Sequence, residues 1–174
     1  GIVENILGLA RRERSQPESI ELTAFTRRFV EEYRQNHPLE TDVMQAVNES
    51  RMQVAMADPQ QLHQVLTALV HNALNYGREP GKPAQVTVSV RLDKSTGAPL
   101  IEVIDRGPGI PVRVAEQLFT PFYTTSEHGT GLGLYIAKQL CEANQCTLQY
   151  VPVPGGGSCF RITMQSAQNL MLPE

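Results

Sequence analysis

Two glycine-rich stretches are the parts of the sequence best suited to binding a ligand. The first, "DRGPGI", covers residues 105–110, and the second, "GTGLGLYIAKQL", begins at Gly129. Glycine leaves the backbone free to adopt positive φ and lets its N–H groups approach a ligand closely. N–H groups at the start of a helix also attract anions. A phosphate chain is therefore the first candidate ligand.

Two common phosphate-binding motifs do not account for these glycines. The P-loop string G-x-x-x-x-G-K-[S/T] does not occur in the sequence. The dinucleotide motif G-x-G-x-x-G directly follows the first strand of a βαβ unit, whereas the stretch at Gly129 follows a loop. The glycines must belong to another kind of nucleotide site.

The clearest helix in the sequence precedes both glycine-rich stretches. Asp58 is a typical N-cap, and Pro59 suits the first helical position. From there apolar residues recur at helical spacing as one broad stripe, made of Leu62, Val65, Leu66, Leu69, Val70, Ala73 and Leu74. Asn72 lies at the border of this stripe, and His71 points towards solvent. The helix should end at Tyr76, which places Asn72 near its end.

The remaining patterns predict a sheet covered by helices. Residues 85–92 and 100–105 read as two strands of a hairpin, so Asp105 should stand at a strand end. Other predicted elements are helices at 22–36, 111–119 and 131–144, paired short strands at 42–47 and 51–57, a mobile loop at 120–130, and strands at 147–153 and 159–164. Helices and hairpins occur in blocks, without strict βαβ alternation. We therefore expect an α+β fold, with one mixed sheet and helices on one face.

Length and composition narrow the class of protein. The chain has 174 residues, enough for one domain with a real core, and its net charge of −3 favours neither nucleic acid nor an anionic membrane as a partner. No apolar run reaches the roughly 18 residues that a membrane span needs. The three cysteines form no C-x-x-C pair and are typical of a reducing compartment. We expect a cytoplasmic fragment, cut from a longer protein because it begins with glycine, that neither spans a membrane nor binds nucleic acid.

Four motifs together resemble the catalytic ATP-binding domain of sensor histidine kinases. They are "HNALNYG" on a helix, "DRGPGI" after a strand, "LFTPFYTT" in a loop and "GTGLGLYIA" opening a helix. They stand in the order of the N, G1, F and G2 boxes of that family, part of the GHKL superfamily with gyrase, Hsp90 and MutL. The combination "PFYTT…GTGLGL" looks most like the nitrogen-regulation and pilus-regulation branch. The resemblance implies a Bergerat-type two-layer α/β sandwich with a mostly antiparallel mixed sheet.

The resemblance also implies roles for individual residues. Asn72 would be the Mg²⁺ ligand, because its amide oxygen is the hard donor that this ion prefers. Asp105 would accept a hydrogen bond from the adenine amino group, with Gly107 and Gly109 letting the backbone pass under the base. Tyr76 would stack on adenine. Without the other motifs, Asn72 also reads as a solvated helix residue and Tyr76 as a helix-end residue.

The second half of the chain would hold the phosphates. Helix-opening N–H groups at Gly129, Gly131 and Gly133 would bind the triphosphate, and Phe119 and Phe122 would fix the ends of the loop called the ATP lid. In this half of the chain, the residues implied to bind the nucleotide are Phe119, Thr125, Gly129, Thr130, Gly131, Leu132, Gly133 and Thr163. Thr163 would sit near adenine, in contact with it directly or through water. Leu132 and Leu134 also read as anchors of the helix.

Several positions depart from the family pattern. Ala68 stands where ATP-hydrolysing relatives carry a glutamate and many kinases an asparagine, which disfavours efficient hydrolysis. Asn75 and Ser126 replace basic residues that reach phosphate in relatives. We expect no catalytic role for His71, which faces outward, and leave open that His128 approaches the phosphates.

None of the four histidines is followed by an acid, so the phosphoacceptor motif of these kinases is missing. We expect residues 1–16 to be the end of a dimerisation helix, 20–166 the catalytic ATP-binding domain and 167–174 a flexible tail. The domain would bind ATP and Mg²⁺ and donate the γ-phosphoryl to a histidine on a separate dimerisation domain of the same kinase. From there it would pass to the receiver domain of a response regulator. Alternatives are a GHKL-type ATPase switch, an anti-sigma-type serine kinase and a nucleotide-binding docking module.

Overall fold

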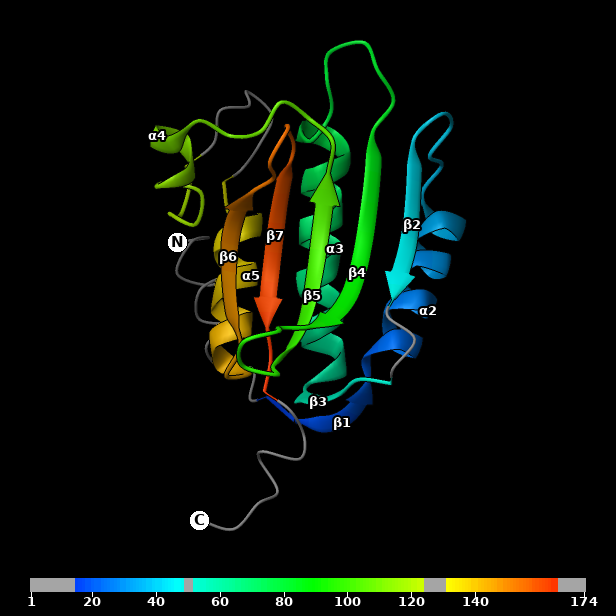
Figure 1. Ribbon diagram of the computed structural model, residues 1–174, viewed down its shortest axis with the longest axis vertical. Coiled ribbons are helices and arrows are strands. Elements are labelled where there is room, and N and C mark those ends of the chain that lie inside the picture. Colours follow the sequence, from blue (N-terminus) through cyan, green and yellow to red (C-terminus); the bar gives the residue numbers. More distant parts are fainter. Residues whose placement is uncertain (1–14, 49–51, 124–130, 166–174) are drawn as a thin grey trace, which may run out of the picture.

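The computed structural model describes residues 15–48, 52–123 and 131–165 (Figure 1). Its elements, in chain order, are β1 (Glu18–Glu21), α2 (Leu22–Asn36), β2 (Val43–Asn48), β3 (Val54–Ala57), α3 (Pro59–Tyr76), β4 (Gln85–Leu92), β5 (Pro99–Asp105), α4 (Val112–Ala115), α5 (Gly133–Ala143), β6 (Thr147–Pro152) and β7 (Ser158–Thr163). The predictions for residues 1–14 and for the tail after 165 lie outside the described residues.

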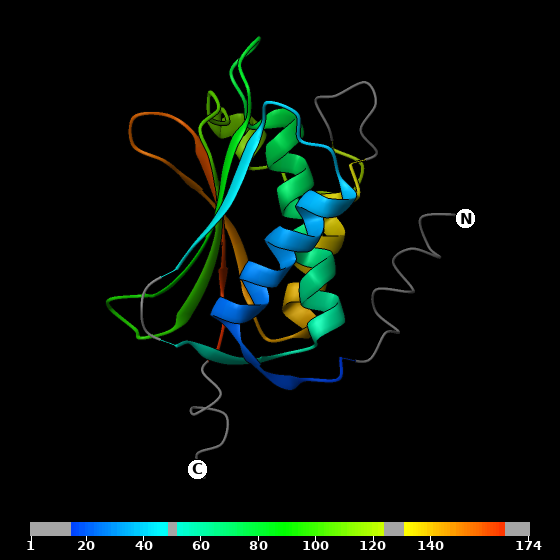
Figure 2. The same cartoon turned by 90° about the vertical axis from the view of Figure 1, so that its right-hand side faces the viewer.

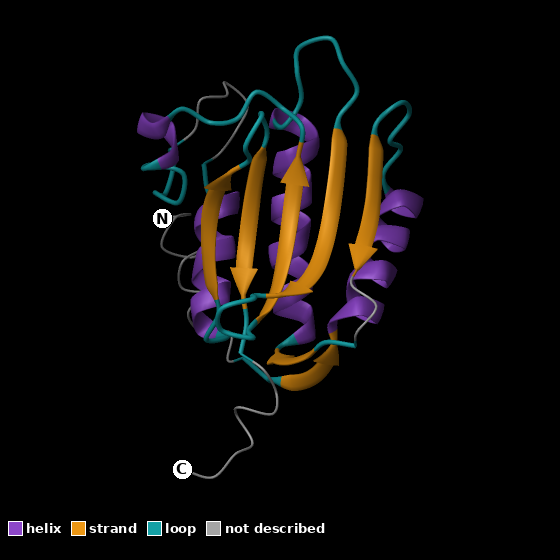
Figure 3. Cartoon of the chain, viewed as in Figure 1, coloured by secondary structure: helices purple, strands orange, loops and turns teal. Residues whose placement is uncertain are grey.

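A five-stranded sheet forms one layer of the molecule. Its strand order is β2-β4-β5-β7-β6, with β2 and β4 parallel and the other neighbours antiparallel. Helices α2, α3 and α5 cover one face of this sheet (Figure 2), and Figure 3 shows the two layers by colour. The predicted α+β sandwich, with a mixed and mostly antiparallel sheet, is confirmed.

The two short strands predicted before α3 do not pair with each other. β2 is an edge strand of the large sheet, whereas β3 pairs antiparallel with β1 in a separate two-stranded sheet. Strand β1 was not predicted, because four residues reading "ESIE" carry too little apolar periodicity to stand out. The pairing of β3 with β1 connects β1 to the N-terminal end of α3.

The core lies between the sheet and α3. The predicted apolar stripe of this helix is buried, with Leu66, Leu69, Val70 and Ala73 fully inaccessible to solvent. Asp58 caps the helix as expected, since its Oδ1 accepts from the backbone N–H groups of residues 60 and 61. Burial of each leucine contributes about 2 kcal/mol, so the apolar stripe anchors α3 to the core. No helix in the described part of the chain has the length and apolarity to cross a membrane.

Candidate functional site

A cavity of about 330 Å³ opens where the end of α3 meets the end of β5. The turn after β5, helix α4 and the start of α5 complete its walls. The residues that line it are Asn72, Tyr76, Gly77, Asp105, Gly109, Ile110, Pro111, Val114, Leu118, Tyr123, Leu134 and Ser158. Four residues of the predicted nucleotide set, from two different motifs, are thus brought together: Asn72, Tyr76, Asp105 and Gly109. The volume is of the size that small-molecule sites have.

Asp105 is a deeply buried charged group of this cavity, with 3% of its surface exposed. Its Oδ1 accepts backbone N–H groups from Gly107 at 3.0 Å and from Ser158 at 3.1 Å. Within the described part of the chain, no hydrogen bond reaches its Oδ2. Burial raises the pKa of this carboxyl, and the two backbone hydrogen bonds offset that effect only in part. One oxygen therefore fixes the side chain, and the other is available to a donor on a ligand.

Glycine is needed at positions 77 and 107 because the end of α3 packs closely against Asp105 and the turn after β5. A Cβ on Gly77 would stand 2.4 Å from Asp105 Cγ, and a Cβ on Gly107 would stand 2.5 Å from the carbonyl carbon of Gly77. Gly109 instead requires glycine through its φ of +83°. The first glycine-rich turn thus lets α3 approach the carboxylate closely.

Asn72 and Tyr76 lie one helical turn apart on α3 and both line the cavity. Asn72 is half-buried, and its amide makes no hydrogen bond to any residue that the structure describes. Among those residues there is also no cluster of three His, Cys, Asp or Glu side chains that could hold a metal ion. An amide oxygen of this kind is a donor that Mg²⁺ accepts, with phosphate and water oxygens as its other ligands. Tyr76 is 51% exposed, so its ring has room for a ligand.

The second glycine-rich stretch is only partly described. Gly131, with φ of +73°, lies against Phe122: the N–H of Phe122 donates to the carbonyl of Gly131 at 2.9 Å. A Cβ on Gly131 would stand 2.4 Å from the Phe122 carbonyl carbon. This contact joins the two ends of the predicted ATP lid. The predicted nucleotide residues Thr125, Gly129 and Thr130, together with Ser126 and His128, lie outside the described residues.

Four further predicted residues stand near the cavity without lining it. Gly107 packs beneath it as described above, and Leu132 is buried directly before α5. Gly133 opens instead on a groove between α3 and α5, together with Ala68 and His71. Phe119 packs edge-on against Phe160, at 6.2 Å between ring centroids, so its role is in packing rather than in lining the cavity.

Thr163, predicted to sit near adenine, is not among the described residues that line the cavity, and its role stays a prediction. In the antiparallel pair of β5 and β7, Thr163 lies opposite Leu100, whereas Ser158 lies opposite Asp105. At about 3.4 Å per residue, these two ends of β7 are roughly 17 Å apart. Ser158 is the residue of β7 that lines the cavity. The sequence could identify it only through the strand register, which no local pattern fixes.

Apolar residues of the cavity were also missed or read differently. Ile110, Val114 and Leu118 line it from the turn and from α4, and Leu134 lines it from α5 while also packing against the core. Ile110, Val114 and Leu118 had no predicted role, and Leu134 was read as an anchor of its helix. His71 is exposed on α3, as predicted, and Asn75 uses its amide to donate to the carbonyl of His71 at 2.8 Å.

Comparison with known proteins supports the same interpretation. Residues 57–168 match the family described as "Histidine kinase-, DNA gyrase B-, and HSP90-like ATPase". The chain is 40% identical over 169 residues to the sensor protein kinase PilS of Pseudomonas aeruginosa, covering 97% of this chain and 32% of PilS. It is 38% identical over 120 residues to the C4-dicarboxylate transport sensor protein DctS of Rhodobacter capsulatus, covering 69% of this chain and 18% of DctS. The chain thus spans about a third or less of the length of these relatives.

Solved structures show the same fold. The catalytic domain of histidine kinase ThkA aligns with a TM-score of 0.72 at 23% identity, covering 87% of this chain and 96% of that domain. Full-length ShkA in complex with AMPPNP aligns with a TM-score of 0.78 at 21% identity, covering 95% of this chain and 35% of ShkA. With the motifs, the cavity and the sequence match in agreement, the chain belongs to the histidine kinase-, DNA gyrase B- and HSP90-like ATPase family, as the domain found in sensor histidine kinases.

Proposed function

We propose that this domain binds Mg²⁺-ATP in the cavity between α3, β5 and α5 and donates the γ-phosphoryl group to a histidine of a separate dimerisation domain. The observation that carries the proposal is the pairing, in one cavity, of a buried carboxylate without a cationic partner and an uncommitted amide, Asp105 and Asn72. The family is one of ATPases, so ATP is the nucleotide that such a cavity serves.

Asp105 would select the base. Its free Oδ2 suits the amino group of adenine, which then supplies the donor that this buried oxygen lacks. Guanine presents an oxygen at the same position, so two acceptors would face each other and binding would weaken. The apolar side chains of Ile110 and Leu134 would contact the flat faces of the base, and Tyr76 lines the same cavity.

Asn72 would hold Mg²⁺ through its amide oxygen, near the phosphates. The metal, when bound, neutralises charge on the β- and γ-phosphate oxygens and supports the loose transition state of phosphoryl transfer. The chain's own contribution is to bind and orient the nucleotide, since this chemistry depends on positioning and on charge stabilisation. Ala68, one turn before Asn72, has no polar group with which to orient a water, so hydrolysis should be slow beside transfer.

The acceptor would be a histidine on the dimerisation domain of the same kinase, and the phosphoryl group would pass on to the receiver domain of a response regulator. Two facts support this: the relatives are named sensor kinases, and no histidine lines the cavity among the described residues. We assign residues 1–16 to the end of that dimerisation domain and 20–166 to the catalytic domain. The cytoplasm, where ATP is available, is the proposed location.

A transfer assay tests the proposal directly. The chain is incubated with γ-labelled ATP, with and without Mg²⁺, together with the dimerisation domain of the same protein. We expect label on the dimerisation domain only when chain, metal and ATP are all present, and we expect that label to be acid-labile and base-stable, as phosphohistidine is. Release of free phosphate without labelled protein would instead support an ATPase switch. A base-labile phosphoserine on a partner would support a serine kinase.

A further inference from the structure

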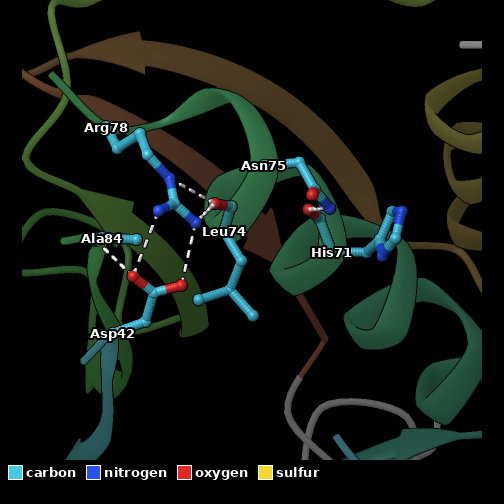
Figure 4. A network of polar contacts seen from close by, with 6 residues as sticks. All are labelled: Asp42, His71, Leu74, Asn75, Arg78 and Ala84. Atoms are coloured by element: carbon cyan, nitrogen blue, oxygen red, sulfur yellow. Dashed lines mark hydrogen bonds and ion pairs between the residues drawn. The ribbon is translucent and has the colours of Figure 1, made fainter. Parts of the chain in front are cut away.

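Arg78, which does not line the cavity, holds the end of α3 through hydrogen bonds (Figure 4). Arg78 follows Gly77 directly, and its guanidinium turns back to the helix. Nε and Nη2 both donate to the carbonyl of Leu74, at 3.0 and 2.6 Å. The last carbonyls of a helix have no partner within the helix, and α3 carries no basic residue in its last turn. Arg78 therefore supplies both the missing donor and the positive charge that the C-terminal end of a helix favours.

The guanidinium of Arg78 also forms an ion pair with the carboxylate of Asp42. Nη1 and Nη2 of Arg78 donate to the two oxygens of Asp42, at 3.2 and 2.8 Å, in a two-pronged pair. Asp42 Oδ1 also accepts the N–H of Ala84 at 2.9 Å. Asp42 directly precedes β2, and Ala84 directly precedes β4. One ion pair thus ties the end of α3 to the starts of two sheet strands, and we call Arg78 and Asp42 the brace.

The brace reaches the cavity through two glycines. The backbone N of Arg78 and the carbonyl carbon of Gly77 lie so close to Gly107 that a Cβ there would stand within 2.7 Å of both. Gly77 in turn lies against the carboxyl group of Asp105. Any shift in the last turn of α3 would therefore move Gly77 relative to the carboxylate. Tyr76, one residue earlier on the same turn, would move with it.

We propose that Arg78 and Asp42 are positioning residues for base recognition: the brace holds the last turn of α3 against Asp105, and so sets both the affinity for the nucleotide and its preference for adenine. The inference rests on the proposed nucleotide site. A helix terminus frays unless its carbonyls are satisfied. The planar fork of arginine satisfies Leu74 and Asp42 at once, which the single ammonium of lysine does not. The phosphates lie beyond the reach of this effect, because the brace acts at the base end.

The test uses Arg78→Lys and Asp42→Asn, with Arg91→Lys as the matched control. Arg91 forms the same kind of two-pronged pair, with Glu102 at 2.6 and 3.2 Å, and its side chain is 32% exposed against 35% for Arg78. It lies on the other face of the sheet, away from the cavity. Affinities for a non-hydrolysable ATP analogue, ADP, AMP and the matching GTP analogue are measured by titration calorimetry. The temperature is kept well below the unfolding midpoint of every variant.

For both brace variants we expect binding about five- to tenfold weaker, equal in size for the ATP analogue, ADP and AMP, with a reduced preference for ATP over GTP. Arg91→Lys should bind like the wild type even if it unfolds at a lower temperature. Wild-type affinity in both brace variants would overturn the inference and leave the proposed function intact. An equal loss in Arg91→Lys, or a loss confined to triphosphates, would also overturn it. A wild-type chain that fails to bind the ATP analogue would instead overturn the proposed function.

Discussion

Glu102 and Asp105 are two buried carboxylates on the same strand, β5, but their hydrogen-bond partners differ in charge. Glu102 accepts from Arg91 Nε at 2.6 Å and from Arg161 Nε at 2.8 Å, on the face of the sheet that no helix covers. Asp105 lies on the helix-covered face and, among the residues that the structure describes, accepts only two backbone N–H groups. Both residues are less than 5% exposed. Burial is therefore equal, and the difference lies in the partners.

The partners decide what each carboxylate can do. Burial alone would raise the pKa of Glu102, but the hydrogen bonds from Arg91 and Arg161 outweigh it and hold the pKa below 4.5. Burial raises the pKa of Asp105 above 3.8, because no cation opposes it. A carboxylate that is fully paired stabilises the fold. A buried carboxylate that still lacks a donor for one oxygen is suited to a ligand that brings one.

Replacing Asp105 should give the largest effect on binding. Asp105→Asn keeps Oδ1 for Gly107 and Ser158 but places an NH₂ group where the adenine amino group would donate. We expect binding of a non-hydrolysable ATP analogue to weaken by about 30- to 100-fold, since two donors would face each other in a buried site. Titration calorimetry measures this. Glu102→Gln is the control on the same strand and should bind within twofold of the wild type; equal losses in the two variants would contradict the comparison.

Replacing Glu102 should instead lower the stability of the fold. Glu102→Gln leaves two arginines without a full counter-charge on the open face. Because those arginine side chains remain 25% and 32% exposed, we expect the free energy of unfolding to fall by about 1–3 kcal/mol. Denaturant unfolding followed by circular dichroism measures it. A Glu102→Gln chain as stable as the wild type would mean that the paired carboxylate contributes nothing to the fold.

The two carboxylates should also respond to pH with opposite signs. The pKa of Glu102 is lowered on folding, so its stabilisation is complete above 4.5 and is lost as the pH falls through the folded pKa. The pKa of Asp105 is raised on folding, so ionising it in the folded state opposes stability as the pH rises from 3.8 through the folded pKa. Variant minus wild-type unfolding free energy should therefore fall with pH for Glu102→Gln and rise for Asp105→Asn. Each slope is at most about 1.4 kcal/mol per pH unit. Parallel slopes in denaturation curves between pH 3 and 7 would contradict the assignment.

The smallest predicted effects on nucleotide binding concern Thr163 and Ser158, at the two ends of β7. Thr163→Val lies opposite Leu100 and should leave the affinity for the ATP analogue unchanged. Ser158→Ala removes a hydroxyl from the cavity wall but keeps the backbone N–H that Asp105 accepts, so we expect a loss of about two- to threefold. Competition binding resolves differences of this size. A larger loss in Thr163→Val than in Ser158→Ala would contradict the strand register.

Local sequence signals predicted the parts of the site that depend on local structure. The N-cap at Asp58 and the apolar stripe of α3 fixed where Asn72 and Tyr76 would lie, because both follow from helical spacing. The strand predicted over residues 100–105 placed Asp105 at a strand end. The family resemblance then brought these residues to one cavity, and the structure confirms that they share it.

The parts that depend on long-range pairing could not be predicted. Ser158 faces Asp105 only through the register of β5 and β7, and the sequence between them does not specify that register. The brace joins Asp42 to Arg78 across 36 positions, and each residue alone resembles an ordinary surface charge. Strand β1 was missed for a similar reason. Its pairing with β3 defines it as a strand, and its own four residues carry no strand pattern.

The hydrogen bond between Phe122 and Gly131 has a consequence for how this domain can change over evolution. The bond, with the close contact beside it, fastens the chain on both sides of residues 124–130. Because each doubling of a closed loop's length costs only about 0.6 kcal/mol in entropy, insertions between the two fastened ends should leave the body of the domain undisturbed. By this argument, a change in the number of residues between the two fastened ends should cost the fold little.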